Sequence, residues 1–185
     1  SGISSGPEYS TDESKKTTGL YSMEDEDGVS YYFRGNVTNN NVQFGEYTED
    51  YYVYEYDMDS TALYFQSLES CQEYNSSCSE SNRVKLASAG DKMYWKIVRV
   101  NGDGSLRLIY NGTNPNSISS NPSSLGETYA AGYVPYNLNN DDPKYTGYTY
   151  DNGTDSFIKK EVDTWYKNAL GSTVYDSKVT GGRFC

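Results

Sequence analysis

The side chains that could carry out chemistry in this chain are carboxylates, lysines, tyrosines and three cysteines, because the sequence contains no histidine. Ser-His-Asp triads, Cys-His pairs and His-ligated zinc sites are therefore excluded. Two carboxylates could hydrolyse a glycosidic bond, but such a pair is defined by its separation in space. Nothing in the sequence selects two of the 26 Asp and Glu residues. We therefore expect a protein that is not an enzyme and needs no cofactor, with a hydrolase as the least favoured alternative.

Acidic loops that contain glycine are the candidate metal sites. An EF-hand loop needs oxygen ligands at positions 1, 3 and 5, glycine at position 6 and glutamate at position 12. The turn MEDEDG places Met23 at position 1 and Arg34 at position 12, and the turn that begins at Asn101 places Leu106 at position 6. Both registers fail, so we predict no metal site. A looser surface site at residues 24–27 or 141–142 is the less favoured alternative.

Two of the three cysteines, Cys71 and Cys78, enclose a six-residue gap that is rich in turn-forming residues. This spacing favours a disulfide in an exported protein, and it does not match the CxxC pattern of zinc sites. We predict that Cys71 and Cys78 form a disulfide. Cys185 has no evident partner in the sequence.

The charge balance excludes two classes of partner. The chain has 15 Lys and Arg residues against 26 Asp and Glu residues, which gives a net charge of -11. Nucleic-acid binding and docking on anionic lipid both depend on cations, so neither is expected. No apolar run approaches the length of about 18 residues that predicts a membrane-spanning helix, so we expect no membrane insertion by this chain.

The elements that must position these side chains begin with a hairpin at residues 94–110. YWKIVRV predicts a strand, Asn-Gly-Asp-Gly a tight turn and SLRLIY a second strand. Alternation places Trp95 and Ile97 on one face of the first strand, and Leu106 and Leu108 on one face of the second. We expect all of them in the core.

One helix has clear start and stop signals in the sequence, and it spans residues 157–170. Asp155 or Ser156 would cap its N-terminus, and Gly171 would end it. Its apolar residues recur at spacings of three and four, which gives one apolar face. The core residues predicted on this face are Ile158, Val162 and Trp165.

The chain divides into a polar N-terminal tail, residues 1–18, and a single extracellular domain, residues 19–185, with an insertion at about residues 46–93. The tail has few apolar anchors, Ile3 and Tyr9. We therefore expect backbone hydrogen bonds to hold it, either along the edge of its own sheet or across to another subunit.

The predicted fold class is α+β and mostly β, with one helix packed on a twisted antiparallel sheet. Tyrosine, with 21 residues, and the abundant Asn, Ser, Thr and Gly favour strands joined by turns. Short closing strands are expected at residues 174–179 and 183–185. The alternative fold is a C-type-lectin-like domain, which the Trp-containing strands and the long loops of the C-terminal half suggest.

Three blocks of sequence in a fixed order carry a resemblance to a known group. They are TGLYSMEDEDGVSYYFRGNVTNNNVQFG, YWKIVRVNGDGSLRLIYNGT and YTGYTYDNGTDSFIKKEVDTWYKNAL, followed by a terminal FC. Over residues 19–185 the chain resembles a group of uncharacterised extracellular domains that are abundant in gut Firmicutes and related low-GC bacteria. The resemblance implies export and a cell-surface setting, and it carries over no catalytic residue. In that group the segment matching residues 42–45 often leads quickly into the strand matching Trp95, so residues 46–93 carry what is particular to this protein.

The function that these observations favour is that of a secreted structural protein of the bacterial cell surface. We expect it to self-associate through its tail, as the subunit of a pilus-like filament, and its net charge would keep free subunits soluble. The alternative is an adhesin that binds a glycan or a host or cell-surface protein through tyrosines and polar loops.

Overall fold

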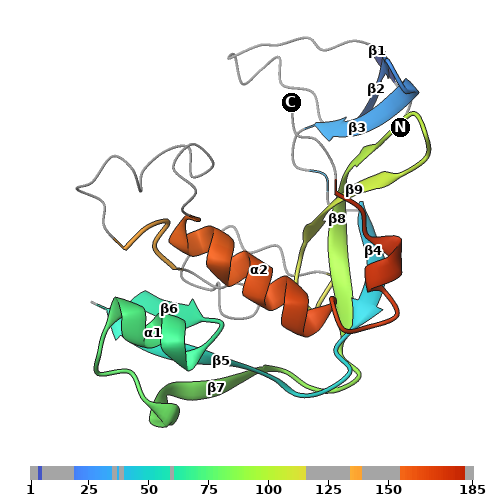
Figure 1. Cartoon of the computed structure of the whole chain (residues 1–185). Coiled ribbons are helices and arrows are strands. Elements are labelled where there is room, and N and C mark those ends of the chain that lie inside the picture. Colours follow the sequence, from blue (N-terminus) through green and yellow to red (C-terminus); the bar gives the residue numbers. More distant parts are fainter. Residues whose placement is uncertain are drawn as a thin grey trace.

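The computed structural model describes residues 4–5, 19–34, 37, 40–58, 61–115, 134–138 and 155–181. In this part of the chain the protein is α+β and mostly β, with two sheets and two α-helices (Figure 1), which confirms the predicted fold class. The predictions for Ile3, Tyr9, Cys185 and a strand at residues 183–185 lie outside the described residues. No helix among the described residues is long and apolar enough to cross a membrane.

The larger sheet has six strands around the central strand β8. Its strands are, in order, β1 (Ser4–Ser5), β2 (Gly19–Asp25), β3 (Gly28–Arg34), β8 (Lys92–Val100) and β4 (Asn41–Glu46), with β9 (Leu106–Tyr110) paired along β8. β4 pairs with the first half of β8 and β3 pairs with its end, so both use the same side of this strand. All these pairs are antiparallel except the pair of β1 with β2.

The turn of the predicted hairpin packs against the turn between β2 and β3. Gly104 has a φ of +85°, which suits a tight turn, and the Asn101 N–H donates to the Ser105 carbonyl at 2.8 Å. A Cβ on Gly102 would lie 2.3 Å from the Asp27 carbonyl oxygen. Only glycine therefore fits at Gly102, and the two turns touch through their backbones.

A β-bulge changes the alternation within β8. The pairing with β9 shifts register between Ile97 and Arg99, so Val98 is the extra residue and is exposed. Before the bulge, Trp95 lies opposite Tyr110, and both rings contact Trp165 of the helix. We call this side of the sheet, marked by Trp95 and Tyr110, the helix face.

Within residues 46–93, which were expected to be an insertion, residues 51–87 build a second sheet of three antiparallel strands. Its order is β6 (Thr61–Phe65), β5 (Tyr51–Met58) and β7 (Arg83–Ala87), and it is accompanied by helix α1 (Leu68–Tyr74) and the 3₁₀ helix η2 (Glu80–Asn82). The chain enters and leaves this unit side by side. The Tyr47 N–H donates to the Asp91 carbonyl at 2.9 Å, and the Gly90 N–H donates to the Tyr47 carbonyl at 2.7 Å. We call residues 47–50 and 88–91 the neck.

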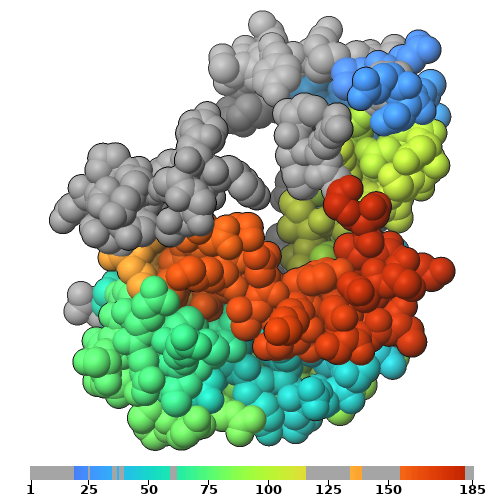
Figure 2. Space-filling view, in the orientation of Figure 1, coloured from blue at the N-terminus to red at the C-terminus, as the bar shows by residue number. Residues whose placement is uncertain are grey.

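Helix α2 (Phe157–Ala169) joins the two sheets. Its N-cap is Ser156, one of the two candidates from the sequence, and the Ser156 hydroxyl accepts from the Lys159 N–H. Phe157 packs in a core cluster of the second sheet, and Trp165 packs in a cluster that reaches the larger sheet. In the space-filling view α2 lies directly against α1 (Figure 2), where Lys160 and Glu73 form an ion pair at 3.8 Å.

Trp165 is in the core as predicted, with 6% of its surface exposed, and Trp95 is partly buried and packs on the same cluster. Ile97, Leu108 and Ile158 are also partly buried.

The prediction that Leu106 lies in the core is wrong, because its side chain is 45% exposed. Leu106 lies on the helix face, in the same alternation as Leu108 and Tyr110. However, α2 has 13 residues and is only about 20 Å long. Since it spans both sheets, it covers only the half of this face that is nearer to the second sheet (Figure 1).

The prediction that Val162 lies in the core is also wrong, because its side chain is 46% exposed. The residues that α2 buries follow a spacing of four and are Phe157, Glu161, Trp165 and Ala169. Val162 lies one position beside this stripe, and a carboxylate takes the buried place. The strand expected at residues 174–179 is wrong as well, since the 3₁₀ helix η5 (Asp176–Lys178) occupies this segment.

Candidate functional site

The edge of the larger sheet at β2 pairs with Ser4 and Ser5 of the N-terminal tail. β1 pairs with β2 in parallel, with Ser4 opposite Tyr21 and Ser5 opposite Ser22. This edge lies at the end of the molecule away from the second sheet (Figure 1). A ladder of this kind is made by backbone groups, so a tail of polar residues can form it.

Side chains on β2 and β3 make the receiving edge rigid. β2 and β3 pair along their whole length, from Gly19 opposite Arg34 to Asp25 opposite Gly28. Tyr21 is buried, its ring stacks on that of Tyr32 at 6.0 Å, and the Arg34 guanidinium lies 5.0 Å from the centre of the Tyr21 ring. The edge is therefore an ordered template for an added strand.

Glu161 is the buried carboxylate of the described chain, and its side chain is 1% exposed. Its Oε2 accepts a hydrogen bond from the Gln66 N–H at 2.6 Å. Burial raises the pKa of Glu161, and the hydrogen bonds from Gln66 and the Ser70 side chain act in the opposite direction. No substrate reaches a carboxylate this deeply buried, so its role is to tie α2 to the segment between β6 and α1.

A second buried group consists of tyrosines around Trp165. The Trp165 Nε1–H donates to the Tyr47 hydroxyl at 3.3 Å, which in turn lies 3.2 Å from the Tyr110 hydroxyl. The Tyr51 hydroxyl donates to the Gln66 Oε1 at 2.6 Å. Burial raises the pKa of each of these three tyrosines, so their hydroxyls stay neutral. Each has a partner inside the fold, which indicates structural hydroxyls.

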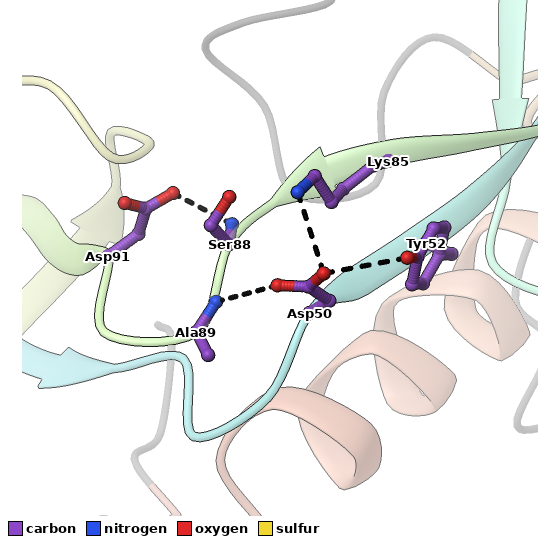
Figure 3. Close-up of polar contacts among 6 residues, drawn as sticks. All are labelled: Asp50, Tyr52, Lys85, Ser88, Ala89 and Asp91. Carbon is purple, nitrogen blue, oxygen red and sulfur yellow. Dashed lines mark hydrogen bonds and ion pairs between the residues drawn. The ribbon is translucent and has the colours of Figure 1, made fainter.

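The neck holds an exposed polar cluster, drawn in Figure 3. Asp50 accepts from the Ala89 N–H at 3.0 Å and forms an ion pair with Lys85 at 3.5 Å, and Asp91 accepts from the Ser88 N–H at 2.8 Å. The Ala89 N–H, and after it the Lys85 ammonium, lower the pKa of Asp50. The bond from the Ala89 N–H to Asp50 fastens the entry of the second sheet to its exit, whereas Asp91 closes a turn within the exit segment.

Cys71 and Cys78 form the predicted disulfide, with their Cα atoms 5.8 Å apart. Both are almost fully buried, and they pack with Leu63, Phe65 and Phe157. Among the residues that the structure describes, no group of three or more Asp, Glu, Cys or His side chains is arranged to hold a metal ion.

Comparison of the chain with protein-family models, with curated proteins and with solved structures finds no match. The function is therefore argued from the geometry.

Sequence reasoning identified the disulfide and Trp165 but missed Glu161 and the register of β1. Glu161 had a signal, because it lies four residues after Phe157 and four before Trp165, which places it in the middle of the buried stripe. The pairing of Ser4 with Tyr21 had none, because a backbone ladder leaves no mark on side-chain types.

Proposed function

We propose that this protein is a non-catalytic, secreted structural protein of the cell surface, whose copies assemble by donating the N-terminal strand to a neighbour. The observation that carries the proposal is the parallel pairing of β1 with β2 at the edge of the larger sheet. The partners of such a pair are backbone groups, which are the same in every copy. A tail that binds its own edge can therefore bind the edge of another copy in the same register.

Exchange of this strand produces an open assembly. The donor, β1, and the acceptor, β2, are different surfaces, so the contact is heterologous and each copy can both give and receive a strand. Heterologous contacts that do not close into a ring propagate as filaments. Strand addition supplies the affinity through main-chain hydrogen bonds, and this is how a polar tail can act as an assembly element.

The disulfide between Cys71 and Cys78 supports the secreted location. Disulfides form and persist in oxidising compartments and outside the cell, and they are rare in the reducing cytosol. The pair closes a short loop inside a small core cluster, as is usual for structural bridges in exported domains.

The test removes the donated strand while the domain stays intact. In the variant Ser4→Pro/Ser5→Pro neither residue has an N–H group, so β1 can no longer donate hydrogen bonds to β2. We expect this variant and a chain lacking residues 1–18 to be folded monomers in analytical ultracentrifugation. The full chain should form assemblies that appear as fibres in negative-stain micrographs. The matched control Ser4→Thr/Ser5→Thr keeps both N–H groups and should assemble. A proline variant that assembles like the full chain refutes strand donation.

A second candidate, an adhesin, is favoured by the uncovered half of the helix face. Leu106, Val100 and Tyr31 lie in one row across three strands, and Leu106 is largely exposed. The exposed Leu106, beside the partly buried Val100 and Tyr31, suits the apolar face of a sugar or of a protein. If the full chain stays monomeric and binds glycans on a glycan array, this result would support the adhesin and not the assembling structural protein.

A further inference from the structure

The uncovered half of the helix face extends from β9 to the edge strand β2. Tyr31 of β3 lies opposite Val100 of β8, and Val100 lies opposite Leu106 of β9. Two residues after Tyr31, Phe33 lies opposite Leu20 of β2. Residues directly opposite each other, and residues two apart in one strand, share a face of the sheet, so Leu20 and Phe33 lie on the helix face. We call these two residues the edge row.

The apolar side chains of this uncovered half form a small surface beyond the reach of α2 (Figure 1). They are Leu20, Val29, Tyr31, Phe33, Val100 and Leu106. The most exposed are Val29, at 49%, and Leu106, at 45%, and the others are partly buried. Together they expose about 400 Å² or less, whereas each partner in a stable interface between folded proteins buries about 800 Å². The surface is therefore too small to hold a second folded domain, and it suits side chains of an extended segment.

The register of β1 determines which residue of the tail reaches the edge row. Ser5 lies opposite Ser22, and the residue two positions earlier in an added strand shares the side of Ser5. In a donated strand that continues the same parallel register, this residue lies opposite Leu20. It is Ile3, the one aliphatic residue of the tail. The position next to the edge row is thus taken by the apolar side chain of an otherwise polar segment.

We propose that the edge row of one copy binds the Ile3 side chain of the tail that a second copy donates, an inference that rests on the strand donation proposed above. A backbone ladder accepts almost any sequence, and specificity in this mode of binding comes from alternate side chains of the added strand. A slip of one residue would turn Ile3 to the other face of the sheet, away from Leu20 and Phe33. Ile3 therefore selects both the tail and its register, while the ladder holds it.

The decisive variants are in the tail, where the substitutions leave the sheet unchanged. Ile3→Ser removes the apolar side chain, and the swap variant Ile3→Ser/Ser4→Ile keeps the composition but moves the isoleucine to the other face. Sedimentation velocity over a concentration series measures assembly. We expect both variants to need about tenfold or more protein to assemble, because burial of an isoleucine side chain contributes an effect of this size. The matched control Ile3→Val lacks one methylene group and should stay within about fourfold of the unmodified chain.

A mixing experiment tests both sides of the contact together. Leu20→Ala truncates the edge row and keeps Ile3, whereas Ile3→Ser keeps the edge row. At a concentration where neither variant assembles alone, the tail of the Leu20→Ala chain can bind the intact edge row of the Ile3→Ser chain. The resulting pair cannot grow, because its remaining tail and its remaining edge row are both altered. We therefore expect dimers without fibres, and a thermal unfolding curve checks that the Leu20→Ala chain is folded.

Ile3→Ser or the swap variant could instead assemble at the same concentration as the unmodified chain. Either result would overturn this inference and leave strand donation by the backbone intact. A mixture of the two folded variants that stays monomeric would overturn it as well. A full chain that stays monomeric at every concentration would overturn both proposals.

Discussion

The two ends of helix α2 are both buried, but the clusters that hold them are built in different ways. Phe157, at the N-terminal end, packs against residues 63–78, a short stretch closed by its own disulfide. Trp165, at the C-terminal end, contacts Trp95, Tyr110 and Tyr47, which come from distant parts of the chain. Apart from the contacts of Phe157 itself, residues 63–78 of the first cluster are stabilised by local contacts and a covalent bond, whereas the second cluster forms only when the whole domain folds. Substitutions in the first cluster and in the second should therefore differ in how much stability they cost and in which elements lose it.

The largest effect is expected from Trp165→Ala. The ring contacts both strands of the hairpin, and its loss leaves a cavity where α2 meets the larger sheet. The free energy of unfolding should fall by about 3–5 kcal/mol in urea titrations, because truncating a buried aromatic residue costs this much. Leu106→Ala is the control in the uncovered half of the same face, and it should cost less than about 1 kcal/mol. Equal losses for the two variants would contradict the position of α2 described above.

The disulfide should rank second. Replacing Cys71 and Cys78 together by alanine should lower stability by about 2–3 kcal/mol, because the cross-link restricts the unfolded chain. The loss should be concentrated in the local cluster. In hydrogen exchange, amides of α1 should exchange faster relative to those of β8 than they do in the unmodified protein. A uniform loss of protection in both elements would show that the two clusters are one cooperative unit.

Gly45→Ala tests the distant-contact cluster through the backbone. Gly45 has a φ of +92°, and a Cβ there would lie 3.1 Å from the Met93 Sδ and 3.2 Å from the Leu170 Cδ2. Strain and overpacking together should cost about 1–3 kcal/mol. Gly90 is the matched control, with a φ of +87° and no atom within 4 Å of the added Cβ. Gly90→Ala therefore reports the strain alone, and Tm values that agree for the two variants would show that Gly45 is not packed as described.

The smallest effect concerns Glu161, which lies between the two clusters. Burial raises its pKa, so the folded state holds the proton more tightly than the unfolded chain does. The resulting stability is fully present below the usual pKa of a glutamate and is lost as the pH rises through the raised pKa. Glu161→Gln keeps an acceptor for the Gln66 N–H and does not titrate, so it should flatten this part of the profile of urea midpoint against pH.

Glu73→Gln is the companion variant for this measurement. The charge of Glu73 helps to raise the pKa of Glu161, so its removal should move the fall in stability to lower pH. The urea midpoints of Glu161→Gln and of the unmodified chain could instead change with pH in the same way from acid to neutral pH. That result would show that Glu161 does not titrate in this range.

The same comparison explains how much of the fold the sequence predicts. The hairpin of β8 and β9 and the disulfide follow from residues that are close in the chain, and both were predicted. The N-cap of α2 was narrowed to Asp155 or Ser156, and it is Ser156. The errors at Leu106 and Val162 concern which surfaces meet, and this depends on the length and rotation of α2 against two sheets. Periodicity gave an apolar face for the helix, but the buried stripe is turned by about one residue so that Glu161 can bind the Gln66 N–H.

The candidate site was predictable only in outline. A polar tail that must be held by its backbone indicates strand pairing, yet its register depends on Tyr21 and Ser22, which carry no signal for a partner. The shared face of Lys96 and Arg99 also escaped notice, because residues three apart point to opposite sides of a regular strand. Only the bulge at Val98, which shifts the register against β9, brings them together.

The neck has a consequence for how such a chain could have evolved. β4 and β8 are antiparallel neighbours, and Glu46 at the end of one lies opposite Lys92 at the start of the other. Without the residues between them, the two strands would form an ordinary β-hairpin. The second sheet thus occupies the position of a hairpin turn. Because the two ends of this segment are hydrogen-bonded to each other at Tyr47, the larger sheet does not limit the length of the chain between them. Such a position accepts a duplicated, lengthened or replaced segment while the strands that receive the tail keep their register, so lineages can diversify the surface without losing the architecture.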